Sequence, residues 1–175
     1  MKKLNIEMSY RIINHGPLLV VSSEFKKKET FTPIAWNMPV EHTPPIIAIT
    51  VSKENYVNFL IKKSKQFCLN VLEIENLDLI KKLGSVSGKD TDKISEFCLK
   101  TKKCKTIAAS YMLNSAAVIE CVLIKTISVE GVDIFLGKTE YCSVSEKFCK
   151  TSWDAEKIRT IHHLGGGNFA TIQKI

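Results

Sequence analysis

The sequence is short of the residue that proteins most often use to read nucleic acids. It holds only two arginines, Arg11 and Arg159, although its net charge is +7. The positive charge comes from lysine, much of it in short runs such as Lys26-Lys27-Lys28. Base edges are usually read by arginine, whereas short lysine runs are typical of solvated loops and helix faces. A basic nucleic-acid-binding barrel is therefore the least favoured hypothesis, and we expect no nucleic-acid partner.

The motifs of several large enzyme classes are also missing. No Gly-x-Gly-x-x-Gly follows a strand, which excludes a Rossmann site. No Gly-x-Ser-x-Gly elbow, Ser-His-Asp order or metal-ligating His-Glu pair occurs. Paired carboxylates for acid–base chemistry have no specific signal either. If the chain is an enzyme, it needs a cofactor that brings its own chemistry.

Long hydrophobic runs are absent. The longest apolar stretches, Pro44 to Val51 and Ala116 to Ile124, are far too short to span a bilayer. The first residues, Met-Lys-Lys-Leu-Asn-Ile-Glu, lack the apolar core of a secretory signal. We expect a soluble cytoplasmic protein without a membrane partner. Its 175 residues, 45% of them hydrophobic, suit one globular domain over residues 1–175.

None of the six cysteines forms a Cys-x-x-Cys pair, which excludes zinc-ribbon and thioredoxin-type sites. Cys68 and Cys121 lie inside apolar, strand-like runs, so we expect reduced, buried thiols there. We expect Cys142 and Cys149 to be exposed, and a redox role for either stays open.

Strand signals dominate the chain, and the helices are short. Two long β-branched runs around Gly131 predict a β-hairpin. Strand and helix do not alternate regularly, which argues against a doubly wound sheet and favours a mainly β barrel with helical insertions. The predicted strands are 17–23, 31–40, 46–51, 67–72, 116–129 and 132–144, and the predicted helices are 55–66, 76–83 and 92–99.

Two prolines bracket a polar and aromatic segment, Thr32-Pro33-Ile34-Ala35-Trp36-Asn37-Met38-Pro39, and a Pro-Pro strand follows it. A planar redox ring needs a flat apolar wall and backbone donors and acceptors along its edge. An extended strand held by prolines supplies both. The alternative for Trp36 is a plain core or dimer-interface residue.

Glycine, hydroxyls and two lysines gather in Gly84-Ser85-Val86-Ser87-Gly88-Lys89-Asp90-Thr91-Asp92-Lys93, beside a predicted helix start. Small residues let backbone N–H groups approach a phosphate, and lysine adds a full positive charge. The spacing is not that of a Walker A loop. A phosphate site and an ordinary helix-capping loop both fit this segment.

A third segment, Ile161-His162-His163-Leu164-Gly165-Gly166-Gly167, joins two histidines to three glycines. Adjacent histidines in an extended chain point to different faces, so we expect no metal site. The glycines indicate either a mobile segment over a pocket mouth or a plain C-terminal turn.

Taken in order, these segments resemble the flavin-reductase-like, FMN-binding split-barrel family, which includes flavoredoxins and related ferric and flavin reductases. The resemblance runs from about Pro17 to about Phe169. It rests on PLLVVSS from residue 17, TPIAWNMPV from 32, PPIIAITV from 44, Asn55-Tyr56, FCLNV from 67, SGKDTDK from 87, Ile119-Glu120-Cys121, Gly137 and HLGGG from 163.

The resemblance implies a six-stranded antiparallel Greek-key split barrel that dimerises, with FMN near the subunit interface. The implied cofactor contacts fall into three groups along the chain. Thr32, Pro33, Ile34, Ala35, Trp36 and Asn37 would line the isoalloxazine ring, Thr50, Val51 and Ser52 would run past the ring and ribityl chain, and Ser52, Asn55, Ser87 and Lys89, with Tyr56, Gly88 and Lys93 beside them, would hold the phosphate. His162 would lie near the open face, where a nicotinamide or another donor approaches.

The chain departs from this family at two places. Many relatives carry Gly-x-x-Asn before the Trp36 strand, where this chain has Lys28-Glu29-Thr30-Phe31. The proline often found before the Glu-Cys strand is also absent, with Ser110-Tyr111-Met112 in its place. The leading hypothesis is an FMN-dependent oxidoreductase that takes electrons from NAD(P)H or a protein donor. The alternative is an FMN-binding electron carrier without NAD(P)H reductase activity of its own.

Overall fold

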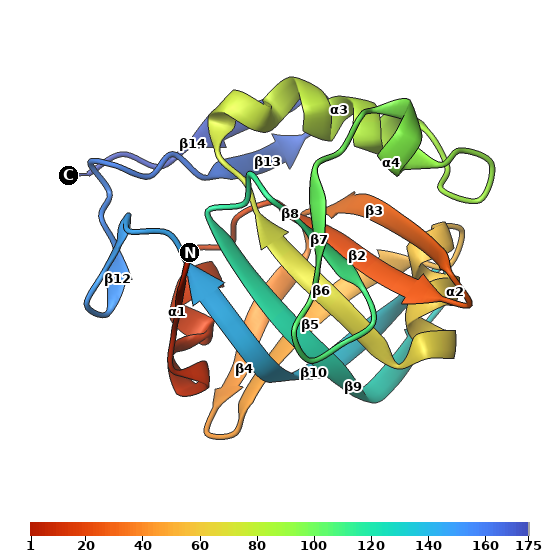
Figure 1. The fold of residues 1–175 in the computed structure, drawn as a ribbon, viewed down its shortest axis with the longest axis horizontal. Coiled ribbons are helices and arrows are strands. Elements are labelled where there is room, and N and C mark those ends of the chain that lie inside the picture. The colour runs from red at the N-terminus through yellow and green to blue at the C-terminus, as the bar shows by residue number, and fades with distance from the viewer. Residues whose placement is uncertain (175) are drawn as a thin grey trace.

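One antiparallel sheet, coiled into a barrel, forms the centre of the computed structural model, which describes residues 1–174 (Figure 1). The neighbouring strands along it are β3, β2, β6, β9, β10, β5 and β4, and the short β1 pairs with β10. Their bounds are β1 Lys2–Lys3, β2 Leu19–Phe25, β3 Lys28–Ile34, β4 Asn37–His42, β5 Pro45–Ser52, β6 Gln66–Val71, β9 Ala117–Val129 and β10 Val132–Val144.

The two end strands of this sheet are consecutive in the chain. Only Ala35 and Trp36 separate β3 from β4, so one bent segment pairs with β2 by its first half and with β5 by its second. The amide of Thr50 donates to the carbonyl of Trp36 at the bend, at 2.9 Å. The predicted split barrel is confirmed. The predicted count of six strands differs from the eight in the sheet because 31–40, predicted as one segment, is divided at this bend and because β1 joins the edge of β10.

The barrel interior is packed with the inward-facing side chains of alternating strand positions. Ile47, Phe67, Ile119 and Phe135 are among its fully buried members. Gly137 lies at an irregularity of the β9–β10 pairing, where a Cβ would come within 2.3 Å of Phe67 Cζ. The close approach of this ring to the backbone of β10 therefore requires glycine.

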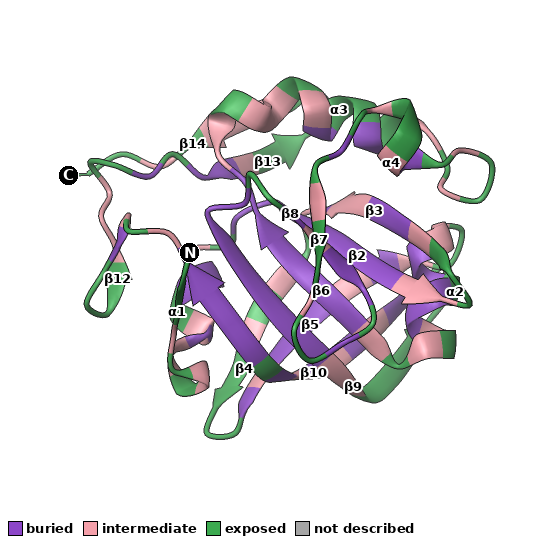
Figure 2. Ribbon diagram, in the orientation of Figure 1, coloured by how far each residue is buried: buried purple, intermediate pink, exposed green. Residues whose placement is uncertain are grey.

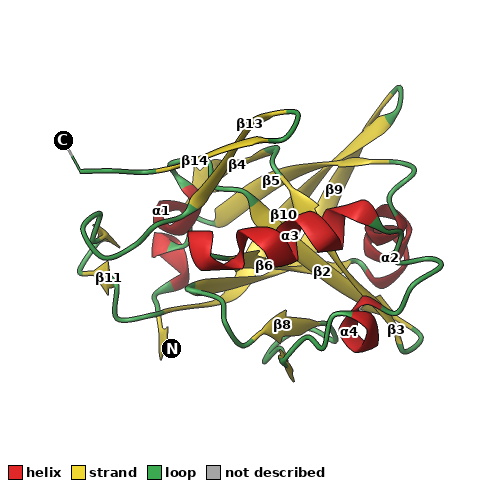
Figure 3. Ribbon diagram, turned by 90° about the horizontal axis from the view of Figure 1, so that it is seen from above, coloured by secondary structure: helices red, strands yellow, loops and turns green. Residues whose placement is uncertain are grey.

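Short helices cover the outside of the barrel. The helices are α1 Tyr10–Ile13, α2 Tyr56–Ser64, α3 Leu77–Ser85 and α4 Lys93–Glu96, with 3-10 turns at Ile6–Met8 and Ile74–Asn76. The amphipathic helix α3 packs Ile80 and Leu83 against Leu18 and Phe31 in a second apolar cluster. Seen from above, α3 crosses the barrel from the side of α1 to the side of α2 (Figure 3). The predicted helix 92–99 is shorter than expected and ends at Glu96.

Three short strand pairs lie outside the main sheet. A C-terminal hairpin is formed by β13 (Ile161–Gly165) and β14 (Asn168–Thr171), and its tip contains the three glycines. It lies beside α3 in Figure 1. The remaining short strands are β7 Thr101–Lys103, β8 Ser110–Met112, β11 Phe148–Cys149 and β12 Ser152–Trp153.

The thiols largely follow the predicted pattern. Cys68 and Cys121 are buried and Cys149 is exposed, as expected. The expectation for Cys142 was wrong, because β1 and the residues after it cover this position, and its Sγ lies 3.6 Å from the carbonyl oxygen of Leu4. Burial raises the pKa of Cys142 to about 12. Figure 2 shows that the barrel strands are largely buried, whereas the outer faces of the helices are exposed.

No helix among residues 1–174 is long and apolar enough to cross a membrane.

Candidate functional site

A cleft of about 430 Å³ lies between strand β3, the start of α2 and the segment that leaves α3. It gathers seven of the residues predicted from the sequence, although these come from three distant parts of the chain. They are Thr32, Pro33, Asn55, Tyr56, Ser87, Gly88 and Lys93. Sequence reasoning did not assign the other lining residues, Glu54, Leu83, Gly84, Ser85 and Val86, as contacts.

Helix α2 begins at this cleft with an open N-terminus. Asn55 is the N-cap residue, but its side chain makes no capping hydrogen bond. The first backbone N–H groups of a helix lack partners within the helix and carry a partial positive charge. The nine-residue α2 therefore offers an anion the N–H groups of its first turn and the side-chain amide of Asn55, whose backbone N–H already donates to the carbonyl of Ser52.

Lys93 supplies a full positive charge at the other side of the cleft. It is 2% exposed. Its ammonium donates to the carbonyl oxygens of Phe31, at 3.1 Å, and Leu83, at 2.6 Å. No carboxylate forms an ion pair with it within residues 1–174. Burial lowers the pKa of Lys93 to about 8, as expected for a cation without a counter-ion.

The loop from Ser87 to Lys89 closes the cleft against β3. A Cβ on Gly88 would lie 2.0 Å from the hydroxyl oxygen of Thr30, so only glycine permits this approach. The Thr30 hydroxyl is buried and has no hydrogen-bond partner. Thr30 belongs to the segment where the sequence departs from its family. In the structure Thr30 contacts Gly88 of the loop from Ser87 to Lys89. This contact was not predicted from the sequence.

Lys89 lies on the outer side of the same loop. Its side chain is exposed and lines a neighbouring groove rather than the cleft itself. The two hollows share Tyr56 and Gly88. Lys89 can therefore reach a ligand that extends out of the cleft past Gly88.

The predicted ring-binding strands present their residues in different directions. The side chains of Ile34 and Val51 are buried in the barrel core, so these residues can offer a flat ring only their backbone. Trp36 is 68% exposed at the β3–β4 bend, which excludes the core alternative. Asn37 donates to the carbonyls of Pro17 and Ala35. Thr50 and Ser52 alternate with buried Ile49 and Val51 and thus lie on the outer face of β5.

The side chains of His162 and His163 lie on different sides of β13, as expected for adjacent residues of a strand. His163 lines a second hollow of about 460 Å³, which is also lined by Ala35, Phe169, Gly166 and Gly167. His162 faces the opposite way, 3.2 Å from the Thr160 hydroxyl and against the ring of His15. Burial lowers the pKa of both His15, to about 4, and His162. His162 was expected near the open face; in the structure His163, not His162, lines this second hollow.

This second hollow adjoins the cleft along β3, because Pro33, Gly84 and Ser85 line both. The structure thus defines a class of small split barrels with a candidate site in a cleft beside β3. The chain belongs to the family described as flavin reductase like domain, whose model matches residues 10–162.

The chain is also similar to three individual proteins. The chain is 29% identical to protein YddH of Escherichia coli K12, over 98% of this chain and 94% of that one. It also has the fold of an FMN-binding domain of a flavin reductases-like enzyme from Shewanella baltica OS155, with a TM-score of 0.88, 19% identity and coverage of 99% and 95% of the two chains. Flavoredoxin of Desulfovibrio vulgaris (Miyazaki F) has a TM-score of 0.82 at 20% identity, with 91% and 88% covered.

Proposed function

We propose that this chain binds FMN non-covalently and acts as a homodimeric oxidoreductase, passing electrons from NAD(P)H or a protein donor to an acceptor. The observation that carries the proposal is that Lys93, which lines the cleft, has a buried ammonium without a carboxylate partner among residues 1–174. A buried cation is costly unless it is paired. A phosphate dianion at the same place would provide the missing partner.

The residues of the cleft fit a flavin 5′-phosphate. Asn55 and the start of α2 provide neutral donors, Ser87 and Gly88 provide a hydroxyl and a close backbone, and Lys93 provides the charge. The flat part of the cofactor would then lie along β3 and its bend, where the backbone of Thr32 to Asn37 and the outer side chains of Thr50 and Ser52 are available. Lys89 would approach the phosphate from the neighbouring groove.

Bound flavin would supply the redox chemistry itself, by exchanging a hydride or single electrons. The chain's own residues then have three tasks. The cleft holds the anionic end, the β3 backbone orients the ring, and the apolar surface around Trp36 keeps water from one side of it. None of these tasks requires a protein acid or base.

The dimer is supported by an apolar outer face on four neighbouring strands. Met38 lies opposite Ala48, and Ile127 lies opposite Ile134, which in turn faces Thr50. Met38, Val40, Ile127 and Val129 are exposed, as is Trp36 at the end of the same surface. A second copy of this chain on this face would remove these side chains from water. It would also cover the open side of the proposed ring position at Thr50.

Sedimentation equilibrium tests the dimer. We expect the wild-type chain to be a dimer and Met38→Glu to shift it towards monomer, while Leu113→Glu, on another exposed apolar residue, leaves it dimeric. A wild-type monomer at tens of micromolar would refute this part of the proposal.

The absorbance spectrum of the purified chain tests flavin binding directly. We expect a yellow protein that, once stripped, takes up one FMN per chain. A colourless chain that takes up no FMN on titration would refute the proposed function.

The second candidate is an electron carrier whose flavin reacts poorly with NAD(P)H. One observation favours it: His162, which was predicted at the donor side, contacts His15 and Thr160 instead. Anaerobic mixing of the FMN-loaded protein with NADH and with NADPH distinguishes the two. Rapid bleaching of the flavin supports the reductase, and slow bleaching supports the carrier.

A further inference from the structure

Two of the six cysteines lie together on an outer face of the barrel. Cys68 belongs to β6, whose alternate residues Phe67 and Leu69 face the barrel core. Cys68 therefore points outward, into a small apolar cluster that covers this face. Cys104, which follows β7, packs against the same cluster, and both thiols are free. The fold thus brings two sulfurs from distant parts of the chain into one apolar cluster.

The segment that carries Cys104, residues 101–112 with strands β7 and β8, is fastened to positions beside Cys68. We call it the covering segment. Glu120 of β9 lies directly opposite Cys68 of β6. Its carboxylate accepts a hydrogen bond from the amide of Lys105, the residue after Cys104, at 2.9 Å. The loop that begins at Cys104 is therefore held over Cys68.

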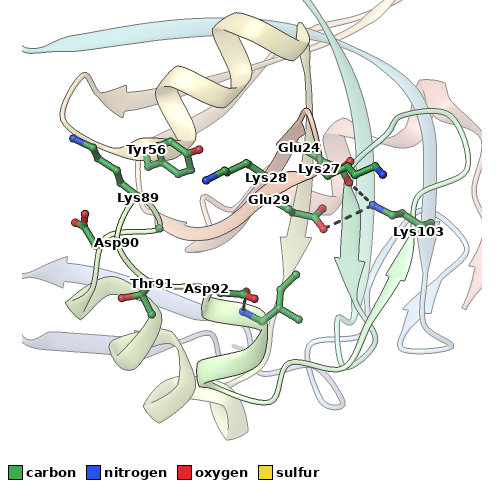
Figure 4. Close-up of a pocket in the computed structure, with 12 residues that line it drawn as sticks. Glu24, Lys27, Lys28, Glu29, Tyr56, Lys89, Asp90, Thr91, Asp92 and Lys103 are labelled. Carbon is green, nitrogen blue, oxygen red and sulfur yellow. Dashed lines mark hydrogen bonds and ion pairs between the residues drawn. The ribbon is translucent and has the colours of Figure 1, made fainter.

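Contacts on the other side fix the covering segment as well. Ser22 of β2 is the second cross-strand neighbour of Cys68, and its hydroxyl donates to the carbonyl of Ser110, at 2.6 Å. The ammonium of Lys103 pairs with the carboxylate of Glu24 (Figure 4). Because the covering segment is tied to both neighbours of β6, it cannot shift easily along the barrel, and the two sulfurs stay close together.

The two sulfurs differ in their access to solvent. Cys68 is 0% exposed, whereas Cys104 is half-buried. Burial raises the pKa of Cys68 well above its ordinary value, and the neighbouring thiol of Cys104 raises it further. An accessible thiol beside a buried one is the arrangement in which the first meets an oxidant and the second resolves the product.

The remaining four thiols are placed differently. Cys121 and Cys142 belong to the barrel core, where solvent does not reach them. Cys98 and Cys149 are exposed, but neither belongs to the cluster around Cys68. An oxidant that attacks Cys104 therefore meets Cys68 as the nearest second thiol.

We propose that Cys104 and Cys68 are a site of oxidative modification, at which hydrogen peroxide converts two thiols into one disulfide. The thiolate of Cys104 attacks a peroxide oxygen, so an S–O bond forms and the O–O bond breaks. The hydroxide that leaves takes up the proton released by the Cys104 thiol and becomes water. The sulfur of Cys68 then attacks that of Cys104, so the S–S bond forms and the S–O bond breaks. The hydroxide leaves with the proton of Cys68 as a second water.

The two sulfurs together lose two electrons, which reduce one hydrogen peroxide to two waters. No step uses a flavin, so the inference does not depend on the proposed function. The chain between the two cysteines contains α3, Ser87, Gly88 and Lys93, which form one side of the cleft. A cross-link that closes this loop restricts the unfolded chain and stabilises the folded one. Peroxide should therefore raise the melting temperature by about 5 °C.

Mass spectrometry of the purified chain tests the pairing, after treatment with a small excess of hydrogen peroxide and digestion without reductant. We expect a cross-linked peptide that joins Cys68 to Cys104, and a rise in melting temperature that dithiothreitol reverses. Cys149→Ser, which removes an exposed cysteine elsewhere, should form the same cross-link. Cys104→Ser should form none, and peroxide should leave its melting temperature unchanged.

Cys68→Ser separates the two steps. Without a second sulfur, Cys104 should be oxidised further to the sulfinic acid, which adds about 32 Da to its peptide. The same sulfinic acid in wild type, without a cross-link, would overturn the inference, because the two sulfurs would then be too far apart. A cross-link from Cys104 to another cysteine, or between two chains, would also overturn it. So would a wild type whose Cys104 stays reduced under conditions that oxidise the exposed Cys149.

Discussion

Two buried charges in this molecule are treated in opposite ways. Asp133 on β10 has a side chain that is 0% exposed, and three groups satisfy it. Lys62 and Ser128 each approach its carboxylate oxygens to 2.5 Å, and the amide of Asn58 donates at 2.8 Å. Burial alone would raise the pKa of Asp133, but the three hydrogen bonds and the charge of Lys62 outweigh it and hold this pKa at about 2.

Lys93 has the reverse environment. Two neutral carbonyls accept from its ammonium, and burial lowers its pKa to about 8. The ionised form of Asp133 therefore stabilises the fold, whereas the charged form of Lys93 destabilises it. This difference distinguishes a structural network around Asp133 from the proposed phosphate site at Lys93. Asn58 links the two, since it belongs to α2, whose N-terminus opens on the cleft.

The largest effect should follow from breaking the compensated charge. Asp133→Ala leaves the amide of Asn58 and the hydroxyl of Ser128 without their acceptor, and we expect it to lower the free energy of unfolding by about 3 kcal/mol in urea titrations. Glu156→Ala, in the exposed pair with Lys174, is the control and should cost at most about 0.5 kcal/mol. Equal small effects would contradict the assignment of Asp133 as a structural centre.

Acid should weaken the same network. Because the folded pKa of Asp133 is about 2 and its ordinary value is 3.8, the stability it contributes is present above about pH 4. It is lost as pH falls from about 4 to about 2, by roughly 2 kcal/mol. The difference in unfolding free energy between wild type and Asp133→Ala should therefore shrink over this window.

The uncompensated charge should behave with the opposite sign. The unfolded chain keeps the Lys93 proton up to about pH 10.5, whereas the folded chain releases it near pH 8. Between these values the unfolded state holds the Lys93 proton and the folded state does not, so the contribution of Lys93 to the stability of the flavin-free protein rises with pH, on the order of 2 kcal/mol. Lys93→Met should lack this gain, as urea titrations at pH 7 and pH 10 of both proteins would show.

Flavin binding should raise the pKa of Lys93 back towards its ordinary value. A bound phosphate favours its charged form, so saturating FMN should reduce the alkaline gain of the wild type. Lys93→Met should also weaken FMN binding at least tenfold, because a phosphate loses a charged partner. Unchanged FMN affinity in a folded Lys93→Met would place the phosphate elsewhere and contradict the assignment of Lys93 to the binding site.

The sequence predicted well what local pattern determines. The hairpin strand predicted over 132–144 matches β10, and the helix predicted over 55–66 contains α2, because each has its own hydrophobic period and turn residues. The loop around Gly88 was found from its composition. The division of 31–40 was not predicted, since both halves are extended and only their different partners, β2 and β5, separate them.

Other features depend on contacts between distant segments. The burial of Lys93 requires β3 and the end of α3 to meet above it, which no local pattern encodes. Cys142 is covered by a short N-terminal strand that has no hydrophobic signal. The placement of His162 and His163 follows strand alternation. The alternation predicts that adjacent histidines face apart, but it does not say which one lines the second hollow.

A matched pair of glycines tests how closely the cleft is built. Gly88→Ala would force a Cβ against the Thr30 hydroxyl, so we expect a loss of about 1–2 kcal/mol in stability and weaker FMN binding. In Gly84→Ala the new Cβ meets Pro33 at an ordinary 3.7 Å, within helix α3. This variant should be neutral or more stable by up to about 1 kcal/mol. If both variants behave alike, the close approach of the loop to β3 does not shape the site.

The smallest effect should come from the exposed charge at the mouth of the cleft. Lys89 is solvated and lies on the groove side of the loop, so its attraction to a phosphate is screened by water and salt. We expect Lys89→Ala to weaken FMN binding about threefold at low salt, with the loss fading as salt is raised. The loss in Lys93→Met should persist under the same conditions, because a buried charge is screened much less. FMN titrations at two salt concentrations measure both, and a larger loss for Lys89→Ala would show that the exposed lysine, rather than the buried one, holds the phosphate.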